Sequence, residues 1–193
     1  MLHPNIVILA GPNGAGKSTL AEPLLATTLG IRHFVNADTL ARGLSAFNAE
    51  EMALKAGKIM LEHLHDLAQQ RANFAFETTL ASRTFAPWIA KLKATGYQVH
   101  LFYVWVPSAD VSVERVLGRV LLGGHSVPEE TIRRRYQRSL ENFFRLYQPL
   151  ADSWEFYDNE RLKSPRLIAI GNATMELAED ENLWRKIKEQ VKA

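Results

Sequence analysis

The stretch GPNGAGKST, residues 11–19, decides the fold. Gly11, Gly16, Lys17 and Ser18 fill every fixed position of the pattern G-x-x-x-x-G-K-[ST], and the strand-like run NIVILA (5–10) comes directly before it. In such a strand–turn–helix unit, successive backbone N–H groups point into one concavity at the positive end of the helix dipole. The stretch therefore predicts a phosphate-binding loop for a nucleoside triphosphate.

The whole loop is the expected ATP site, and each residue type has a role in it. Lys17 is expected to reach the β- and γ-phosphates, and the Ser18 hydroxyl to bind Mg²⁺. The predicted nucleotide-binding residues are Gly11, Pro12, Asn13, Gly14, Ala15, Gly16, Lys17, Ser18 and Thr19.

Apolar runs of strand length alternate with longer helical patterns along the rest of the chain. Strands are expected at 5–10, 33–38, 73–78 and 98–106, with 154–159 and 166–171 as a closing pair. Helices are expected at 17–28, 49–71, 83–95, 108–122, 128–147 and 174–191. Together with the phosphate-binding loop after the first strand, this alternation predicts a single α/β domain over 1–193 with a P-loop NTPase fold. Its mainly parallel sheet would carry helices on both faces, with the working residues beyond the carboxyl ends of the strands.

The composition narrows the classes of partner. The 193 residues include 23 basic and 21 acidic side chains, and this near balance argues against a nucleic-acid or membrane surface. The absence of cysteine excludes disulfides and thiolate metal sites. No apolar run reaches the roughly 18 residues of a membrane span, and the N-terminus lacks the features of a signal peptide. A cytoplasmic protein with a small-molecule partner is expected.

Two acidic residues follow expected strands. Asp38 ends FVNAD, where it could take the proton of an attacking hydroxyl or simply cap the next helix. Glu77 leaves the apolar run of FAFETTLASR, where it could hold a water on Mg²⁺ or grip a substrate hydroxyl. Helix capping is the structural alternative there, and Thr79 or Ser82 would serve it equally well. Position therefore favours function for Glu77 and leaves Asp38 open.

The stretch LLGGHSVPEETIRRRY (121–136) allows three interpretations: a DNA-binding arm, an ABC-type signature or a kinase lid. An ABC-type ATPase needs a following strand that ends in Asp-Glu, whereas WEFYDN (154–159) ends in Asp-Asn, which we expect to be structural. Residues 119–145 carry six arginines against three glutamates, and their aromatic side chains fall on an apolar helical stripe, so a DNA arm is disfavoured. The lid is the interpretation that remains.

A lid over about 119–147 would supply cations and exclude water. Gly123 and Gly124 form a plausible hinge, and Ser126 and Glu129 have the spacing of a capping box. Arg119 precedes the hinge and can stabilise the transferring phosphoryl group. Helical rotation puts Arg133 and Arg135 at the edges of the apolar stripe without choosing between them, and His125 could assist or be a turn residue. The arginines expected on a solvated face are Arg134, Arg138 and Arg145.

Together, GPNGAGKST, FVNAD, FET, GGHSVPEETIRRRY and WEFYDN resemble the zeta toxin family of P-loop kinases, in its small single-domain branch. The resemblance implies a fold like that of nucleotide and shikimate kinases. It also implies ATP- and Mg²⁺-dependent phosphorylation of a small molecule, which in well-known zeta toxins is UDP-N-acetylglucosamine. It implies that Asp38 is the base and that Glu77 and Thr79 line the substrate side, where Arg83 and His125 are also expected. PEETIRRRY is similar to the lid helix of adenylate kinases, which favours Arg135 over Arg133. An antitoxin protein is the partner that the resemblance suggests.

A different class of function, a nucleotide-dependent regulatory module, is also compatible with the phosphate-binding loop. It would hydrolyse ATP slowly and phosphorylate no acceptor. Such a module has no need for Asp38 and Glu77 to converge beside the γ-phosphate, whereas a kinase does. The geometry of these two side chains therefore discriminates between the two classes.

Overall fold

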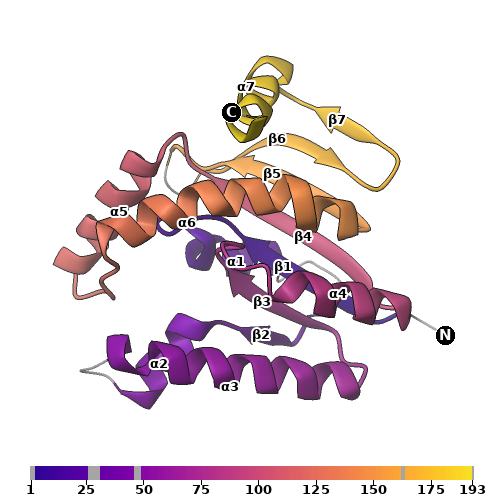
Figure 1. The fold of residues 1–193 in the computed structure, drawn as a ribbon, viewed down its shortest axis with the longest axis horizontal. Helices are drawn as coiled ribbons and strands as arrows, with labels where there is room; N and C mark the ends of the chain where they lie inside the picture. Colours follow the sequence, from indigo (N-terminus) through magenta and orange to yellow (C-terminus); the bar gives the residue numbers. More distant parts are fainter. Residues whose placement is uncertain (1–2, 26–30, 46–48, 162–163, 193) are drawn as a thin grey trace.

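The computed structural model describes residues 3–25, 31–45, 49–161 and 164–192. In chain order the elements are β1 (Asn5–Ala10), α1 (Lys17–Leu25), β2 (His33–Val35), α2 (Ala37–Leu44), α3 (Ala49–Gln69), β3 (Phe74–Thr78), α4 (Phe85–Ala94), β4 (Gln98–Trp105), α5 (Ala109–Leu121), α6 (Glu129–Asn142), the π-helix η1 (Phe143–Tyr147), the 3₁₀ turn η2 (Gln148–Leu150), β5 (Ser153–Asp158), β6 (Arg166–Gly171), β7 (Glu176–Ala178) and α7 (Glu181–Lys192). Figure 1 shows the α/β architecture that they form.

The sheet has the strand order β2-β3-β1-β4-β5-β6-β7. The first five strands in this order run parallel, and β6 and β7 are antiparallel additions at one edge. β1 lies between β3 and β4, so the phosphate-binding loop leaves the middle of the sheet. Because parallel strands end at the same edge, this order brings the loops after β1, β2, β3 and β4 together.

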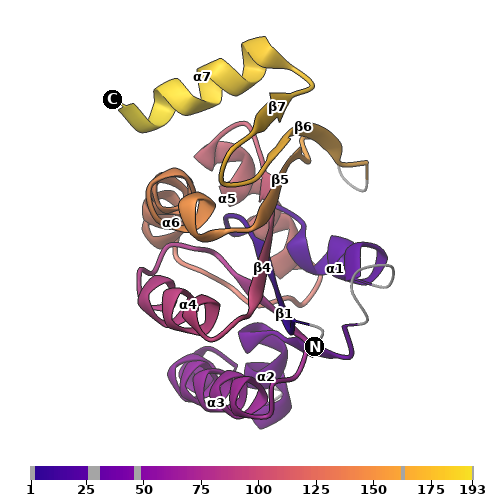
Figure 2. The ribbon, with the colours of Figure 1, turned by 90° about the vertical axis from the view of Figure 1, so that its right-hand side faces the viewer.

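Helices cover both faces of the sheet, as Figure 2 shows, with α3, α4 and α6 on one side and α1 on the other. The strands are correspondingly apolar in both directions: Ile6 and Ile8 join the core beneath α3, α4 and α6, while Val7 and Leu9 join the core beneath α1. The first core also receives α7 through Trp184. The predicted fold class is confirmed.

Three elements differ from the expectation. The strand expected at 33–38 ends at Val35 and gives way to α2, so FVNAD is a strand–helix junction. The helix expected at 174–191 begins at Glu181, because 176–178 form β7. The helix expected at 128–147 changes to a π-helix after Asn142. Residues 26–28 of the first expected helix lie outside the described residues.

Two smaller expectations also need correction. Pro128 is the N-cap of α6 and no side chain caps that end, so Ser126 and Glu129 do not form the expected capping box. In the described ranges, no helix combines the length and the apolarity that crossing a bilayer requires.

Candidate active site

A cavity of about 1310 Å³ opens at the carboxyl edge of the sheet. Its floor is the phosphate-binding loop, and its walls come from α2 and α3, from the segment after β3, and from α5 and α6. The elements that sequence reasoning singled out as functional therefore surround one space.

The phosphate-binding loop presents part of its length to the cavity. Its lining residues are Asn13, Gly14, Gly16, Lys17, Ser18 and Thr19, while Gly11, Pro12 and Ala15 are buried beneath them. Gly11 has a φ of 141°, and a Cβ there would collide with the carbonyl oxygen of Val104. Only glycine fits where the loop leaves the sheet this close to β4.

Lys17 is buried at the base of the cavity. Its Nζ donates to the Pro12 carbonyl oxygen at 2.9 Å and lies 3.7 Å from Glu77 Oε1. Burial lowers the pKa of Lys17, although Glu77 and Asp38 act in the opposite direction. The ammonium group is poorly solvated, which favours its pairing with an anion that enters the cavity.

Glu77, with a side chain only 11% exposed, joins three segments of the site. Its Oε2 accepts hydrogen bonds from Ser18 Oγ at 2.8 Å and from Asn36 Nδ2 at 2.7 Å. A hydroxyl and a carboxylate side by side are oxygen donors of the kind that Mg²⁺ prefers, and the nucleotide phosphates and water usually complete its coordination. Ser18 and Glu77 thus fit a magnesium ion bound together with a nucleotide. The described residues hold no cluster of three or more acidic, histidine or cysteine side chains that would bind a metal alone.

Asp38 lies in the first turn of α2, which corrects the expectation that it ends a strand. The N-cap is Asn36, whose Oδ1 accepts from the backbone N–H groups of Asp38 at 2.8 Å and Thr39 at 3.2 Å. Capping therefore does not occupy the Asp38 carboxylate, which is exposed on the cavity wall. Asp38 is close enough to Lys17 and Arg135 to influence both charges.

Asn36 was missed by sequence reasoning, although it belongs to the motif FVNAD. Its oxygen accepts from the backbone N–H of the candidate base Asp38, and its nitrogen donates to the candidate metal ligand Glu77. One amide therefore connects the two acids. An Asn directly before an Asp at a strand–helix junction was the available signal, because Asn is among the best capping residues.

Arginines from α5 and α6 form one wall of the cavity. Arg135 is half-buried there, and burial lowers its pKa while Asp38 acts in the opposite direction. Arg133 points elsewhere, in ion pairs with Asp110 at 2.7 Å and Glu129 at 2.8 Å. The structure thus places Arg135 and not Arg133 beside the cavity, as the adenylate-kinase similarity suggested.

Arg134 and Arg138 are exposed, as expected for a solvated face, and both also line the cavity, which the sequence did not indicate. The helix face opposite the apolar stripe borders the cleft where the active-site loops gather. Arg145 donates to the Val191 carbonyl oxygen at 3.1 Å and so contacts α7. Arg115, which was also missed, lines the cavity from α5.

Arg119 lies next to the predicted hinge and lines the cavity. Its Nη2 donates to the His125 carbonyl oxygen at 2.7 Å, and its buried Nε has no hydrogen-bond partner among the described residues. The contact holds the turn through Gly123, which has a φ of 81°. His125 contributes its backbone there and lies outside the described cavity lining, as does the exposed Arg83, whereas Thr79 lines the cavity.

Most of α6 is fixed to the sheet and does not hang freely over the cavity. Tyr136 donates to the Val106 carbonyl oxygen at 2.9 Å, and Ser139 bonds to the hydroxyl of Tyr103 at 2.8 Å. Asn142 donates to the carbonyl oxygen of Leu80, at 2.7 Å, in the loop after β3. A closing motion hinged at Gly123 would therefore leave α6 in place and move only the turn that precedes it.

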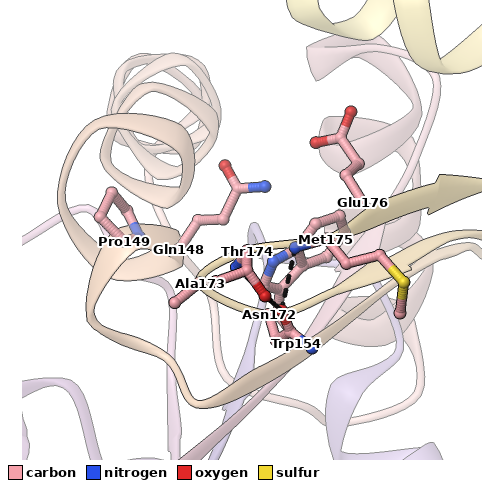
Figure 3. Close-up of a pocket in the computed structure, with 8 residues that line it drawn as sticks. All are labelled: Gln148, Pro149, Trp154, Asn172, Ala173, Thr174, Met175 and Glu176. Atoms are coloured by element: carbon pink, nitrogen blue, oxygen red, sulfur yellow. Dashed lines mark hydrogen bonds between the residues drawn. The ribbon is translucent and has the colours of Figure 1, made fainter.

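A second, smaller cavity of about 370 Å³ lies by the β6–β7 turn (Figure 3). Within it, Asn172 Oδ1 accepts hydrogen bonds from Thr174 and Met175. Glu176 accepts from Trp184 at 2.9 Å and Lys188 at 2.6 Å. Its polar groups stabilise the hairpin, and its described lining contains no cation and a single acid, Glu176, which is already paired with Lys188.

Comparison with known proteins agrees with this geometry. The sequence profile of the zeta toxin family matches residues 2–161. An uncharacterized protein of Haemophilus influenzae is 26% identical over 136 residues, which cover 70% of this chain and 95% of that protein. A cytidylate kinase of Ignicoccus hospitalis is 36% identical over 91 residues, covering 43% of this chain and 52% of the kinase.

Solved structures show the same fold. The AvrRxo1-ORF1:AvrRxo1-ORF2 complex with sulphate ions contains a chain that superposes with a TM-score of 0.77 at 18% identity. The match covers 96% of this chain but only 63% of that one. The PezAT toxin–antitoxin system of Streptococcus pneumoniae gives a TM-score of 0.63 at 15% identity, covering 100% of this chain and 87% of that one. The family match and the kinase-like fold together support a nucleotide-binding, kinase-like function.

Proposed function

Because the chain belongs to the zeta toxin family, we propose that it is a kinase that uses ATP and Mg²⁺. It transfers the γ-phosphoryl group of ATP to a hydroxyl of a small acceptor. The observation that carries this proposal is the meeting of Ser18, Glu77 and Asp38 at one cavity above Lys17. A phosphate cradle alone would serve any nucleotide switch. Asp38 lies on the wall of the same cavity, and Asn36 caps α2 in its place, so the Asp38 carboxylate can act as the base that a hydroxyl acceptor needs.

The phosphate-binding loop would hold the nucleotide. Backbone N–H groups of the loop and the start of α1 attract the phosphates, and Lys17 exchanges its contact with Pro12 for a phosphate oxygen. Ser18 and Glu77 would hold Mg²⁺, which neutralises charge on the β- and γ-phosphates when bound. This assigns Glu77 to the metal side, since Ser18 is its hydrogen-bond partner.

Asp38 would accept the proton of the attacking hydroxyl as the oxygen–phosphorus bond forms. The positive charges of Arg135 and Lys17 lie close enough to interact with the charge of this carboxylate. Arg119 and Arg135 would stabilise the negative charge on the transferring phosphoryl group. Arg119 lines the cavity, and a guanidinium has more N–H donors than the bond from Nη2 to the His125 carbonyl oxygen uses, so it can also donate to an oxygen of the substrate.

The acceptor is proposed to carry a negative charge of its own. The described cavity lining contains seven basic side chains (Lys17, Lys58, Arg115, Arg119, Arg134, Arg135 and Arg138) against three acidic ones (Asp38, Glu77 and Glu114). This excess of four positive charges exceeds the two negative charges of a magnesium–ATP complex. Lys58, Arg134 and Arg138 have no hydrogen bond or ion pair with a described residue and are free to meet a second anion. UDP-N-acetylglucosamine meets this requirement, with Thr79 on the acceptor side.

A phosphoryl-transfer assay with labelled ATP and Mg²⁺ tests the proposal. The acceptors would include matched pairs, such as UDP-N-acetylglucosamine and the uncharged N-acetylglucosamine. Label on an anionic hydroxyl compound, and none on its neutral counterpart, would support both the kinase and the anionic acceptor. Release of label only as inorganic phosphate, at a rate that no acceptor changes, would favour the regulatory module instead.

A further inference from the structure

The pair Asp158–Asn159, at the end of β5, has no place in the chemistry described above, yet Asn159 is only 1% exposed and touches the phosphate-binding loop. Its backbone N–H donates to Trp105 at 2.9 Å, which holds the residue beside β4. Its side-chain Nδ2 donates to the carbonyl oxygen of Ala15 at 2.8 Å, across 144 positions of sequence. Asn159 lies outside the described cavity lining and so contacts the loop from behind.

This hydrogen bond fixes the orientation of one peptide group of the loop. The peptide between Ala15 and Gly16 is trans, so its C=O and N–H point in opposite directions. When Asn159 holds the carbonyl oxygen on the buried side, the N–H of Gly16 must point away from Asn159. Gly16 lines the cavity, so its N–H is directed toward the space that phosphates would occupy.

Gly16 is also required sterically at this contact. Its φ is 89°, and a Cβ there would lie 2.5 Å from Asn159 Nδ2. The glycine therefore allows the asparagine to approach the loop backbone closely. Residues 16 and 159 form one device built from two distant segments of the chain.

The chemistry of the amide indicates that its donor is the important half. Asn159 Oδ1 is buried without a hydrogen-bond partner among the described residues, which is a cost that an apolar side chain would avoid. Arg115 holds the backbone behind it, donating to the carbonyl oxygens of Asn159 at 2.9 Å and Glu160 at 2.6 Å. The backbone of Asn159 is thus held rigidly, and its Nδ2 donor is held against the loop even though Oδ1 stays without a partner. Such support by neighbouring hydrogen bonds is what a positioning residue requires.

We propose that Asn159 is a positioning residue for nucleotide binding, which orients the Ala15–Gly16 peptide so that the loop is preorganised for phosphate. The inference rests on the proposed nucleotide site. It concerns a residue that touches neither ATP nor acceptor, and it acts through the backbone of the loop.

The test compares Asn159→Ala and Asn159→Asp with the unaltered chain in calorimetric titrations with ADP. Asn159→Asp keeps the size of the side chain but sets an acceptor against the Ala15 carbonyl. The matched control is Asp158→Asn, because Asp158 is the buried neighbour that bonds to Glu160 N–H and lies 3.7 Å from Arg166, away from the loop. We expect both Asn159 variants to bind ADP about tenfold more weakly and the control to bind normally. The reason is that the variants would misplace one charge-assisted hydrogen bond, from the Gly16 N–H to a phosphate oxygen.

Three readouts separate positioning from general damage. In turnover, the KM for ATP should rise in the Asn159 variants while the KM for the acceptor is unchanged. Amide hydrogen exchange at Ala15 and Leu20, whose N–H groups donate to the carbonyl oxygens of Pro12 and Gly16, should be faster in both variants without any nucleotide. This readout tests the support even if ADP fails to bind the unaltered chain and the proposed function is wrong. Normal ADP affinity and normal exchange in Asn159→Asp, or an equal loss in Asp158→Asn, would overturn the proposal. If Asn159→Ala does not fold, Asn159→Asp decides.

Discussion

The hydroxyl of Ser18 donates a 2.8 Å hydrogen bond to Glu77, although 59 positions separate the two residues in sequence. The sheet explains the encounter. β1 pairs with β3 in a register that sets Leu9 opposite Glu77 and Ala10 opposite Thr78, so the loop after β1 begins beside the carboxylate. The fold thus brings a hydroxyl and an acid to the point where a magnesium–nucleotide complex would bind.

Glu77→Gln should weaken magnesium binding while sparing metal-free nucleotide binding. The variant keeps an oxygen that can accept from Ser18 or Asn36 but removes the charge that a divalent cation requires. We expect the affinity for Mg²⁺ in the ADP complex to fall about 10- to 100-fold. Titrations with ADP in the presence of Mg²⁺ or of a chelator measure the difference.

Glu114→Gln is the matched control for this prediction, because Glu114 lines the same cavity and no hydrogen bond joins it to Ser18. It should leave the magnesium dependence unchanged. An identical loss in both variants would mean that the general charge of the cavity, and not a metal ligand, is responsible.

Lys17→Met should abolish nucleotide binding and yet raise the thermal stability of the free protein at neutral pH. Burial lowers the pKa of Lys17 below the ordinary 10.5, so the buried charge destabilises the folded state. Between the lowered pKa and 10.5, the unfolded chain binds more protons here than the folded one, and the stability of the unaltered protein rises with pH in that window. Melting temperatures of both proteins should therefore converge as the pH approaches 10.5, and a gap that widens would refute this.

Replacing Arg134 and Arg138 by glutamine should raise the KM for the acceptor with little change in the KM for ATP. Both side chains line the cavity on α6 without a carboxylate partner among the described residues. We expect about a tenfold increase for each arginine that contacts the anionic group. Initial rates at varied acceptor concentration provide the measurement.

Arg133→Gln tests whether position, and not the general charge of α6, matters. Arg133 pairs with Asp110 and Glu129 outside the cavity, so its loss should leave both KM values unaltered. If all three variants raise the KM for the acceptor equally, the general positive charge of α6, and not a direct contact, would explain the effect.

Sequence reasoning predicted the sheet and the position of the phosphate-binding loop because both follow local patterns. The apolar run from Asn5 to Ala10 forms a strand, and the glycines after it adopt the positive φ angles that the loop requires. It was wrong on α2 because FVNAD is too short for its periodicity to separate a strand from a capped helix start. The cap at Asn36 decides this, through hydrogen bonds that no pattern of apolar residues reports.

The residues that were missed depend on which surface of a helix or strand faces the cavity. Arg134 and Arg138 occupy the polar side of α6, which helical rotation defines without revealing whether solvent or a cleft lies beyond it. Asn159 contacts Ala15 only because β5 follows β4 in the sheet order. Such relationships are properties of the assembled fold, and single-sequence patterns carry little information about them.

The most direct test of the proposed chemistry is the rate of phosphoryl transfer to UDP-N-acetylglucosamine by Asp38→Asn compared with the unaltered chain, at saturating ATP and Mg²⁺. Asp38 is exposed and does not cap α2, so the substitution should leave folding and ADP affinity intact. Loss of a general base predicts a fall in kcat of about 10²- to 10⁴-fold. Transfer by Asp38→Asn at an undiminished rate would contradict the central claim that Asp38 activates the acceptor hydroxyl.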